Sequence, residues 1–127
     1  MASNTKDVSK WLDQILPSFN LANWDITVAT EPADSDSWAD IEAHSQANTA
    51  TLRIAHGFWA LGKHKQRLVL THEVCHILTW RLDECVEKLE KPLGELAWAV
   101  FSPNYDDYAE RTVEQVATVI APFLPLP

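Results

Sequence analysis

Two histidines four positions apart, His72 and His76, lie in a largely apolar run, and Glu73 directly follows the first of them. The pattern is H-E-x-x-H. Four residues make slightly more than one turn of a helix, so the two imidazoles stand one above the other and can bind one metal ion. Glu73 is turned about 100° from His72, where it can take a proton from a water molecule that the metal activates without being a ligand itself. The spacing therefore predicts a zinc site with His72 and His76 as ligands and Glu73 as the general base.

A catalytic zinc needs a third protein ligand and keeps one position open for water. The longer pattern H-E-x-x-H-x-x-G-x-x-H is excluded, and with it a metzincin, because Thr79 stands where its glycine belongs and Leu82 where its third histidine belongs. The remaining candidates are downstream carboxylates. Glu110 and Glu114 lie one helical turn apart. Glu110 as third ligand, with Glu114 as a hydrogen-bond partner of one histidine, would give a His, His, Glu site, and Glu114 itself is an alternative third ligand.

Several neighbouring residues leave alternatives open. Three further acids are rival third ligands: Glu95, Asp106 and Asp107. The two aspartates are more simply explained as caps or dipole partners near a helix start. Tyr105 and Tyr108 are candidates to donate a hydrogen bond to a developing oxyanion. Cys75 lies inside the motif, and we expect a buried thiol there rather than a ligand. The remaining histidines are expected on the surface: His44, His56 and His64.

The composition is that of a globular protein, which we expect to form a single domain over residues 1–127 with a proline-rich tail at 122–127. A formal charge of −8 would repel a phosphate backbone, so nucleic acid is not an expected partner. No segment approaches the roughly 18 uncharged apolar residues of a membrane span, and the first ten residues lack an apolar signal region. We therefore expect a cytoplasmic protein without membrane association, and free thiols at Cys75 and Cys85.

The first half of the chain has the pattern of one helix and a small sheet. Apolar residues recur at helical spacing over 5–16. Strand-like segments follow at 24–30, 38–44 and 49–55, which predict a three-stranded antiparallel or mixed sheet. The segment 49–55 is a candidate edge strand, able to hold an extended peptide by main-chain pairing.

The second half has the pattern of helices, which makes the expected fold class α+β. A central helix over 63–81 carries the histidines. One or two short helices are expected over 84–101, broken near Pro92 and Gly94. Ser102, Pro103 and Asn104 predict a clear break, after which a final helix runs over 105–120.

The stretch HEVCH on one helix and the stretch AERTVEQVATVIAP on a later one resemble the gluzincin group of zinc peptidases. More narrowly, they resemble the small phage- or prophage-associated metallopeptidases and the repressor-cleaving metallopeptidases of mobile elements. The resemblance covers about residues 8–122, of which HEVCH is the specific part. It implies a minimal zincin-like fold, zinc as cofactor, His72, His76 and Glu110 as ligands, and Glu73 as general base. It also implies a peptide or protein substrate and, for a phage-encoded chain, the host cytoplasm.

Two functions of different classes are consistent with these residues. The first is a zinc-dependent peptidase that hydrolyses peptide bonds by metal-activated water. The alternative is a non-catalytic zinc-binding or interaction module of a phage or mobile element, whose structural zinc would need a fourth protein ligand such as Cys75 or Glu114. An acidic partner protein without metal is a third, weaker possibility. The oligomeric state is open.

Overall fold

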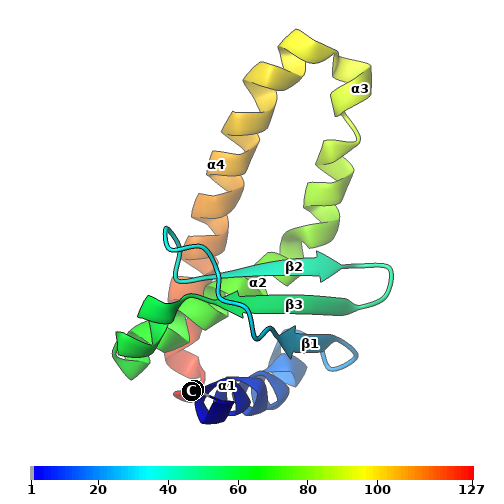
Figure 1. The fold of residues 1–127 in the computed structure, drawn as a ribbon. Helices are drawn as coiled ribbons and strands as arrows, with labels where there is room; N and C mark the ends of the chain where they lie inside the picture. The colour runs from blue at the N-terminus through cyan, green and yellow to red at the C-terminus, as the bar shows by residue number, and fades with distance from the viewer. Residues whose placement is uncertain (1) are drawn as a thin grey trace.

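The computed structural model describes residues 2–127, with side chains from residue 4 onward. Its architecture is α+β, as predicted: a first helix, a three-stranded mixed sheet and two long helices (Figure 1). The helices and strands are α1 (Ala2–Ile15), β1 (Asp25–Val28), β2 (Ala39–His44), β3 (Thr49–Ile54), α2 (Lys63–Glu87), α3 (Glu90–Leu93) and α4 (Glu95–Ile120). Short 3₁₀ helices lie at Leu16–Phe19, His56–Ala60 and Ala121–Phe123.

The strand order in the sheet is β1-β3-β2. β1 pairs with β3 in parallel, from Asp25 opposite Thr49, whereas β2 pairs with β3 antiparallel, from Ala39 opposite Ile54. The prediction that 49–55 is an edge strand is therefore wrong, because β3 lies at the centre. The physical reason is that β3 returns to pair in parallel with β1, a contact between segments distant in the sequence that alternation does not encode.

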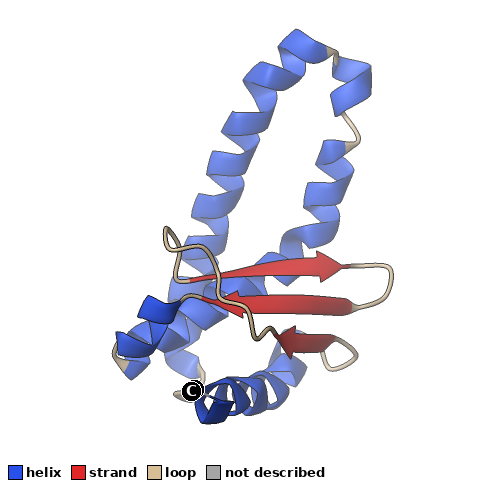
Figure 2. Ribbon diagram, in the orientation of Figure 1, coloured by secondary structure: helices blue, strands red, loops and turns tan. Residues whose placement is uncertain are grey.

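One face of the sheet packs against α1 and α2, and the three elements share one core (Figure 2). Burial alternates along β3, as expected for a strand with one face on the core and one towards water. α1 contributes residues at helical spacing, including Val8, Trp11 and Leu12. The core residues of α2 are Leu70, Val74 and Ile77. These contacts fix the rotation of α2 about its axis, and with it the direction of the side chains on its other faces.

The end of α2, α3 and the first half of α4 leave the body of the protein as a projecting hairpin (Figure 1). In α4, only Val113 and Ala117 are buried, and they pack against Cys75 of α2. We call residues 82–108 the arm; they comprise the end of α2, all of α3 and the first half of α4. No side chain of the arm is buried. The chain turns between α3 and α4 at Gly94, whose φ of 83° is one that glycine adopts without strain. Within residues 2–127, no helix combines the length and apolar character needed to cross a bilayer.

The predicted break at residues 102–104 is wrong, since α4 continues through Pro103. A proline inside a helix removes one backbone hydrogen bond and costs about 3 kcal/mol, which is why the sequence pattern favoured a break. The carbonyl it frees belongs to Ala99, which is exposed, so water can satisfy it. Asp106 and Asp107 consequently lie inside α4, and the prediction that they cap a helix start is wrong as well.

Candidate metal centre

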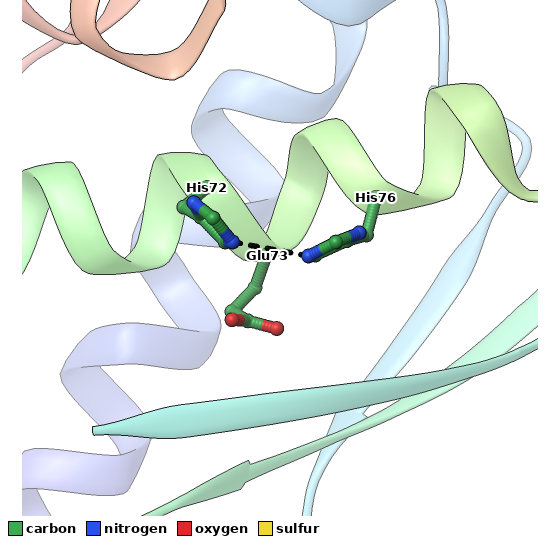
Figure 3. Close-up of side chains that lie close together, drawn as sticks. All are labelled: His72, Glu73 and His76. Atoms are coloured by element: carbon green, nitrogen blue, oxygen red, sulfur yellow. Dashed lines mark hydrogen bonds between the residues drawn. The ribbon is translucent and has the colours of Figure 1, made fainter. Parts of the chain in front are cut away.

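The side chains of His72, Glu73 and His76 form a group that could hold a metal ion, with one potential ligand atom from each within 4.8 Å of the others. The two histidines project from successive turns of α2, and Glu73 points from between them towards the sheet (Figure 3). Their Nε2 atoms lie 3.0 Å apart. As the spacing of four residues on a helix predicts, the two imidazole nitrogens therefore face each other at close distance.

Glu110 reaches the same point from α4. Its Oε1 lies 2.7 Å from Nε2 of His72, and its Oε2 lies 3.2 Å from Nε2 of His76. The packing of Val113 and Ala117 on Cys75 positions this part of α4 beside the motif helix. The carboxylate thus contacts both histidines through the ring nitrogens that face each other.

Glu114, one turn further along α4, contacts the opposite side of the His72 ring. Its Oε2 lies 2.5 Å from Nδ1 of His72. A carboxylate accepts hydrogen bonds, so this contact favours the His72 tautomer with the proton on Nδ1 and a lone pair on Nε2. That lone pair then faces the Glu110 carboxylate and the second imidazole. Such a convergence of acceptors is favourable when a proton or a cation lies among them.

The nitrogen and oxygen atoms of these three side chains lie close together. Oε1 of Glu110 is 2.7 Å from Nε2 of His72, Oε2 of Glu110 is 3.2 Å from Nε2 of His76, and the two Nε2 atoms are 3.0 Å apart. Two imidazoles and one carboxylate make a donor set that zinc accepts, as do other first-row ions. The structure therefore brings Glu110 into contact with both histidines of the group that could hold a metal ion.

Two titratable groups at the centre are perturbed. Burial raises the pKa of Glu73 to about 8, and the carboxylates of Glu110 and Asp40 act in the same direction. A bound dication would lower the pKa of Glu73 again by stabilising its charged form. Burial also lowers the pKa of His76, against an opposing effect of Glu110, which favours the neutral imidazole that metals bind.

Hollows lie on two sides of the centre. One, of about 230 Å³, is lined by His72, Glu73 and Glu110 together with the residues that lead into β2, among them Trp38. The other, of about 300 Å³, lies between α2 and α4 and includes Glu110 in its lining. A third hollow of about 590 Å³, beside Arg81 and the loop before β1, contains none of the predicted site residues. Glu110 therefore lies at the boundary between two open spaces.

The rival acids lie in other surroundings. Glu95 begins α4 at the far end of the arm. Asp106 lines the hollow between the helices, and Asp107 pairs with Arg111 at 3.2 Å. The contacts with the imidazoles come instead from Glu110 and Glu114.

The two tyrosines are placed differently from each other. The hydroxyl of Tyr105 donates to Oδ1 of Asp83 at 2.7 Å, and this hydrogen bond is the main reason that the pKa of Tyr105 is raised to about 12. The side chain of Tyr108 is exposed. The Tyr105 hydrogen bond joins the two helices of the arm.

Cys75 packs against Val113 and Ala117, and burial raises the pKa of its thiol to about 11, so it stays protonated at neutral pH. The surplus histidines are all exposed: His44, His56 and His64. One residue that affects the centre was not singled out from the sequence. Asp40 on β2 raises the pKa of Glu73, and no spacing marks it because β2 and α2 meet only in the fold.

No protein-family model matches the chain, and comparison with curated proteins and with solved structures gave no significant match. The assignment of the centre rests on its own geometry. The chain is an α+β protein that carries a His, Glu, His group positioned to bind a metal ion.

Proposed function

We propose that this protein is a zinc-dependent peptidase whose ligands are His72, His76 and Glu110. One observation carries the proposal: both oxygens of Glu110 approach the facing Nε2 atoms of the histidines, beside the buried carboxyl of Glu73. Two histidines and a glutamate around zinc, with a further glutamate close by, form a donor set suited to the hydrolysis of a carbonyl compound. The resemblance of HEVCH to zinc peptidases makes a peptide bond the favoured target, and a phage or mobile element the favoured source.

When bound, zinc would supply the Lewis acidity that activates a water molecule. Glu73 would accept a proton from the attacking water and then donate it to the leaving amine. Glu114 would hold His72 in the tautomer that keeps Nε2 free for the ion. Because β2 pairs only with β3 and its first residue lines the site hollow, its other edge is available to hold an extended peptide by main-chain pairing.

The alternative function, a non-catalytic zinc-binding or interaction module, needs a fourth protein ligand for a structural zinc. Cys75 is a protonated thiol packed against Val113 and Ala117. Glu114 contacts Nδ1 of His72, on the opposite side of the ring from the shared point. Both observations favour a centre with an open fourth position, and hence the peptidase.

The first test is metal content per chain, measured by elemental mass spectrometry on protein purified without a histidine tag. We expect about one zinc in the wild type and little or none in Glu110→Ala. Glu114→Ala should keep most of its metal with an affinity lowered by about 10- to 100-fold, since it removes only an orienting hydrogen bond. A wild type that binds no zinc, even when zinc is supplied, would overturn the proposal.

The second test separates binding from chemistry. Glu73→Gln should retain its zinc and lose activity by about 10²- to 10⁴-fold, the usual contribution of a general base, when cleavage of a proteome-derived peptide library is followed by mass spectrometry. Glu31→Gln, in the exposed loop between β1 and β2, is the control. Undiminished cleavage by Glu73→Gln would refute the assigned base. A zinc-loaded wild type that cleaves no peptide would favour the non-catalytic module.

A further inference from the structure

The arm exposes large apolar side chains that a pair of helices normally buries. Leu82, Leu96, Val100 and Tyr108 are the most exposed of these, with 82% of Leu96 and 62% of Val100 accessible. A helix with apolar residues that no neighbour covers marks an interaction surface. Among residues 2–127, nothing packs over this part of the arm to bury it.

The two helices of the arm are also spread apart enough to leave a crevice. Its wider part is the hollow of about 300 Å³ beside Trp80, and a narrower part of about 80 Å³ continues towards Trp98. The two parts share four lining residues, including Tyr105 and Asp83, whose hydrogen bond spans the helices. Because Glu110 lines the wider part, the crevice runs from the arm to the metal centre.

The charge of the arm restricts what can occupy this crevice. Residues 82–108 contain seven carboxylates and two lysines, Lys88 and Lys91, so the arm carries five of the eight net negative charges of the chain. Four of these carboxylates line the wider part of the crevice, among them Glu87 and Asp106. A second copy of the chain would bring the same negative charge, and an anionic lipid surface would be repelled. A basic partner is complementary.

We propose that the arm is a docking surface for a basic, amphipathic helical segment of another protein. Its apolar face would cover the exposed leucine and valine side chains and enter the crevice beside the tryptophans, while its lysine or arginine residues meet the carboxylates at the rim. The docking itself requires no catalysis. That the docked segment belongs to the substrate, and is led along the crevice towards Glu110, rests on the proposed peptidase function.

The test uses the full-length protein and a fluorescent peptide of about 18 residues, long enough to form a helix, with leucine at helical spacing and lysine elsewhere. Binding is measured by fluorescence anisotropy at physiological salt. One control peptide carries glutamate in place of lysine, and another has the same composition as the probe in an order without helical periodicity. We expect the probe to bind at least about tenfold more tightly than either control.

Matched variants locate the binding on the arm. Val100→Ser lies on the arm and Val119→Ser lies near the other end of α4, with 62% and 64% of the native side chains exposed. Glu87→Gln lies at the crevice, and Glu31→Gln lies in the exposed loop between β1 and β2. The two arm variants should weaken binding of the probe by about tenfold, whereas the two control variants should change it by less than about twofold. Circular dichroism checks that all four variants stay folded.

Three results would overturn the docking proposal. The first is equal binding of the probe and the control peptides, or equal effects of the arm and control variants. The second is a dimer whose dissociation is promoted by Val100→Ser and not by Val119→Ser, which would assign the surface to a second copy. The third is a loss of vesicle binding with the same selectivity, which would assign it to a membrane. Docking of the probe without cleavage of any peptide would leave the arm proposal intact and count against the peptidase alone.

Discussion

α2 and α4 each have one part in the body of the protein and one part in the arm, and the two parts differ in burial. Near the metal centre, Leu70 and Val74 of α2 and Val113 of α4 are buried against other elements. In the arm, the same two helices continue without one buried side chain. The comparison separates two sources of order: tertiary packing sets the geometry of the centre, whereas the arm depends on backbone hydrogen bonds and a few contacts between its helices. Exposed apolar side chains without a core, such as those of the arm, are typical of an interaction surface.

One leucine is truncated in each region, and the largest expected effect is that of the truncation in the core. Leu70→Ala removes a side chain that is fully buried and should lower the free energy of unfolding by about 2 to 5 kcal/mol. Leu96→Ala in the arm should change it by no more than about 0.5 kcal/mol, because little packing is lost. Urea denaturation followed by circular dichroism measures both. A comparable loss for Leu96→Ala would mean that the arm takes part in the cooperative core.

The second prediction concerns the pH dependence of the metal-free protein. The pKa of Glu73 is raised from 4.5 to about 8 in the folded state, so between these pH values the folded chain holds a proton that the unfolded chain has released. Stability must therefore fall as pH rises through this range, by an amount on the order of a few kcal/mol. Glu73→Gln should remove this part of the slope and gain stability relative to the wild type at about pH 8. The comparison is made with chelator present, at about pH 5 and about pH 8, and equal slopes would contradict it.

The third prediction concerns a substitution that restores a backbone hydrogen bond in the arm. Pro103→Ala allows an N–H to bond to the carbonyl of Ala99 and removes a local cost of about 3 kcal/mol. Because the arm lacks a core, the gain should appear locally. Native-state hydrogen exchange should show slower exchange of amides in the first half of α4, with the midpoint of global unfolding little changed. A large rise in that midpoint would show that arm and body unfold as one unit.

A smaller effect than that of Leu70→Ala is expected for Tyr105→Phe. The lost hydrogen bond to Asp83 lies at a partly exposed position, so the free energy of unfolding should fall by about 0.5 to 1.5 kcal/mol. If the chain is the proposed peptidase, its kcat should be unchanged, because the hydroxyl donates to Asp83 of α2 rather than to a reacting group. A fall in kcat of about 10²- to 10³-fold would instead identify Tyr105 as an oxyanion donor.

The motif and the helices near it could be predicted because their information is local. The spacing of His72 and His76 specifies a shared point as soon as the segment is helical, and apolar periodicity specifies the helix. Glu110 and Glu114 could be proposed from their separation by one turn. Their different contacts with His72, at Nε2 and Nδ1, depend on how α4 packs through Val113, which a sequence pattern does not contain.

The errors came from features that are decided by the rest of the molecule. β3 has the alternation of a half-buried strand, and that pattern is the same for an edge and a central position, so the parallel pairing of β3 with β1 could not be inferred. Pro103 is a local signal against a helix, and it was overridden because the freed carbonyl faces water in an exposed arm.

The convergence of Glu110 with His72 and His76 has a consequence for the mechanics of the chain. An ion held by these three residues would act as a cross-link between α2 and α4 and would close a loop over residues 77–109, which contains the whole arm. By analogy with a disulfide across a loop of this length, such a closure would raise the free energy of the opened chain by roughly 3 to 4 kcal/mol, because it lowers the conformational entropy of that chain. The zinc proposed for chemistry would then also set the stiffness of the hairpin, and its removal would loosen the arm before the sheet and its core.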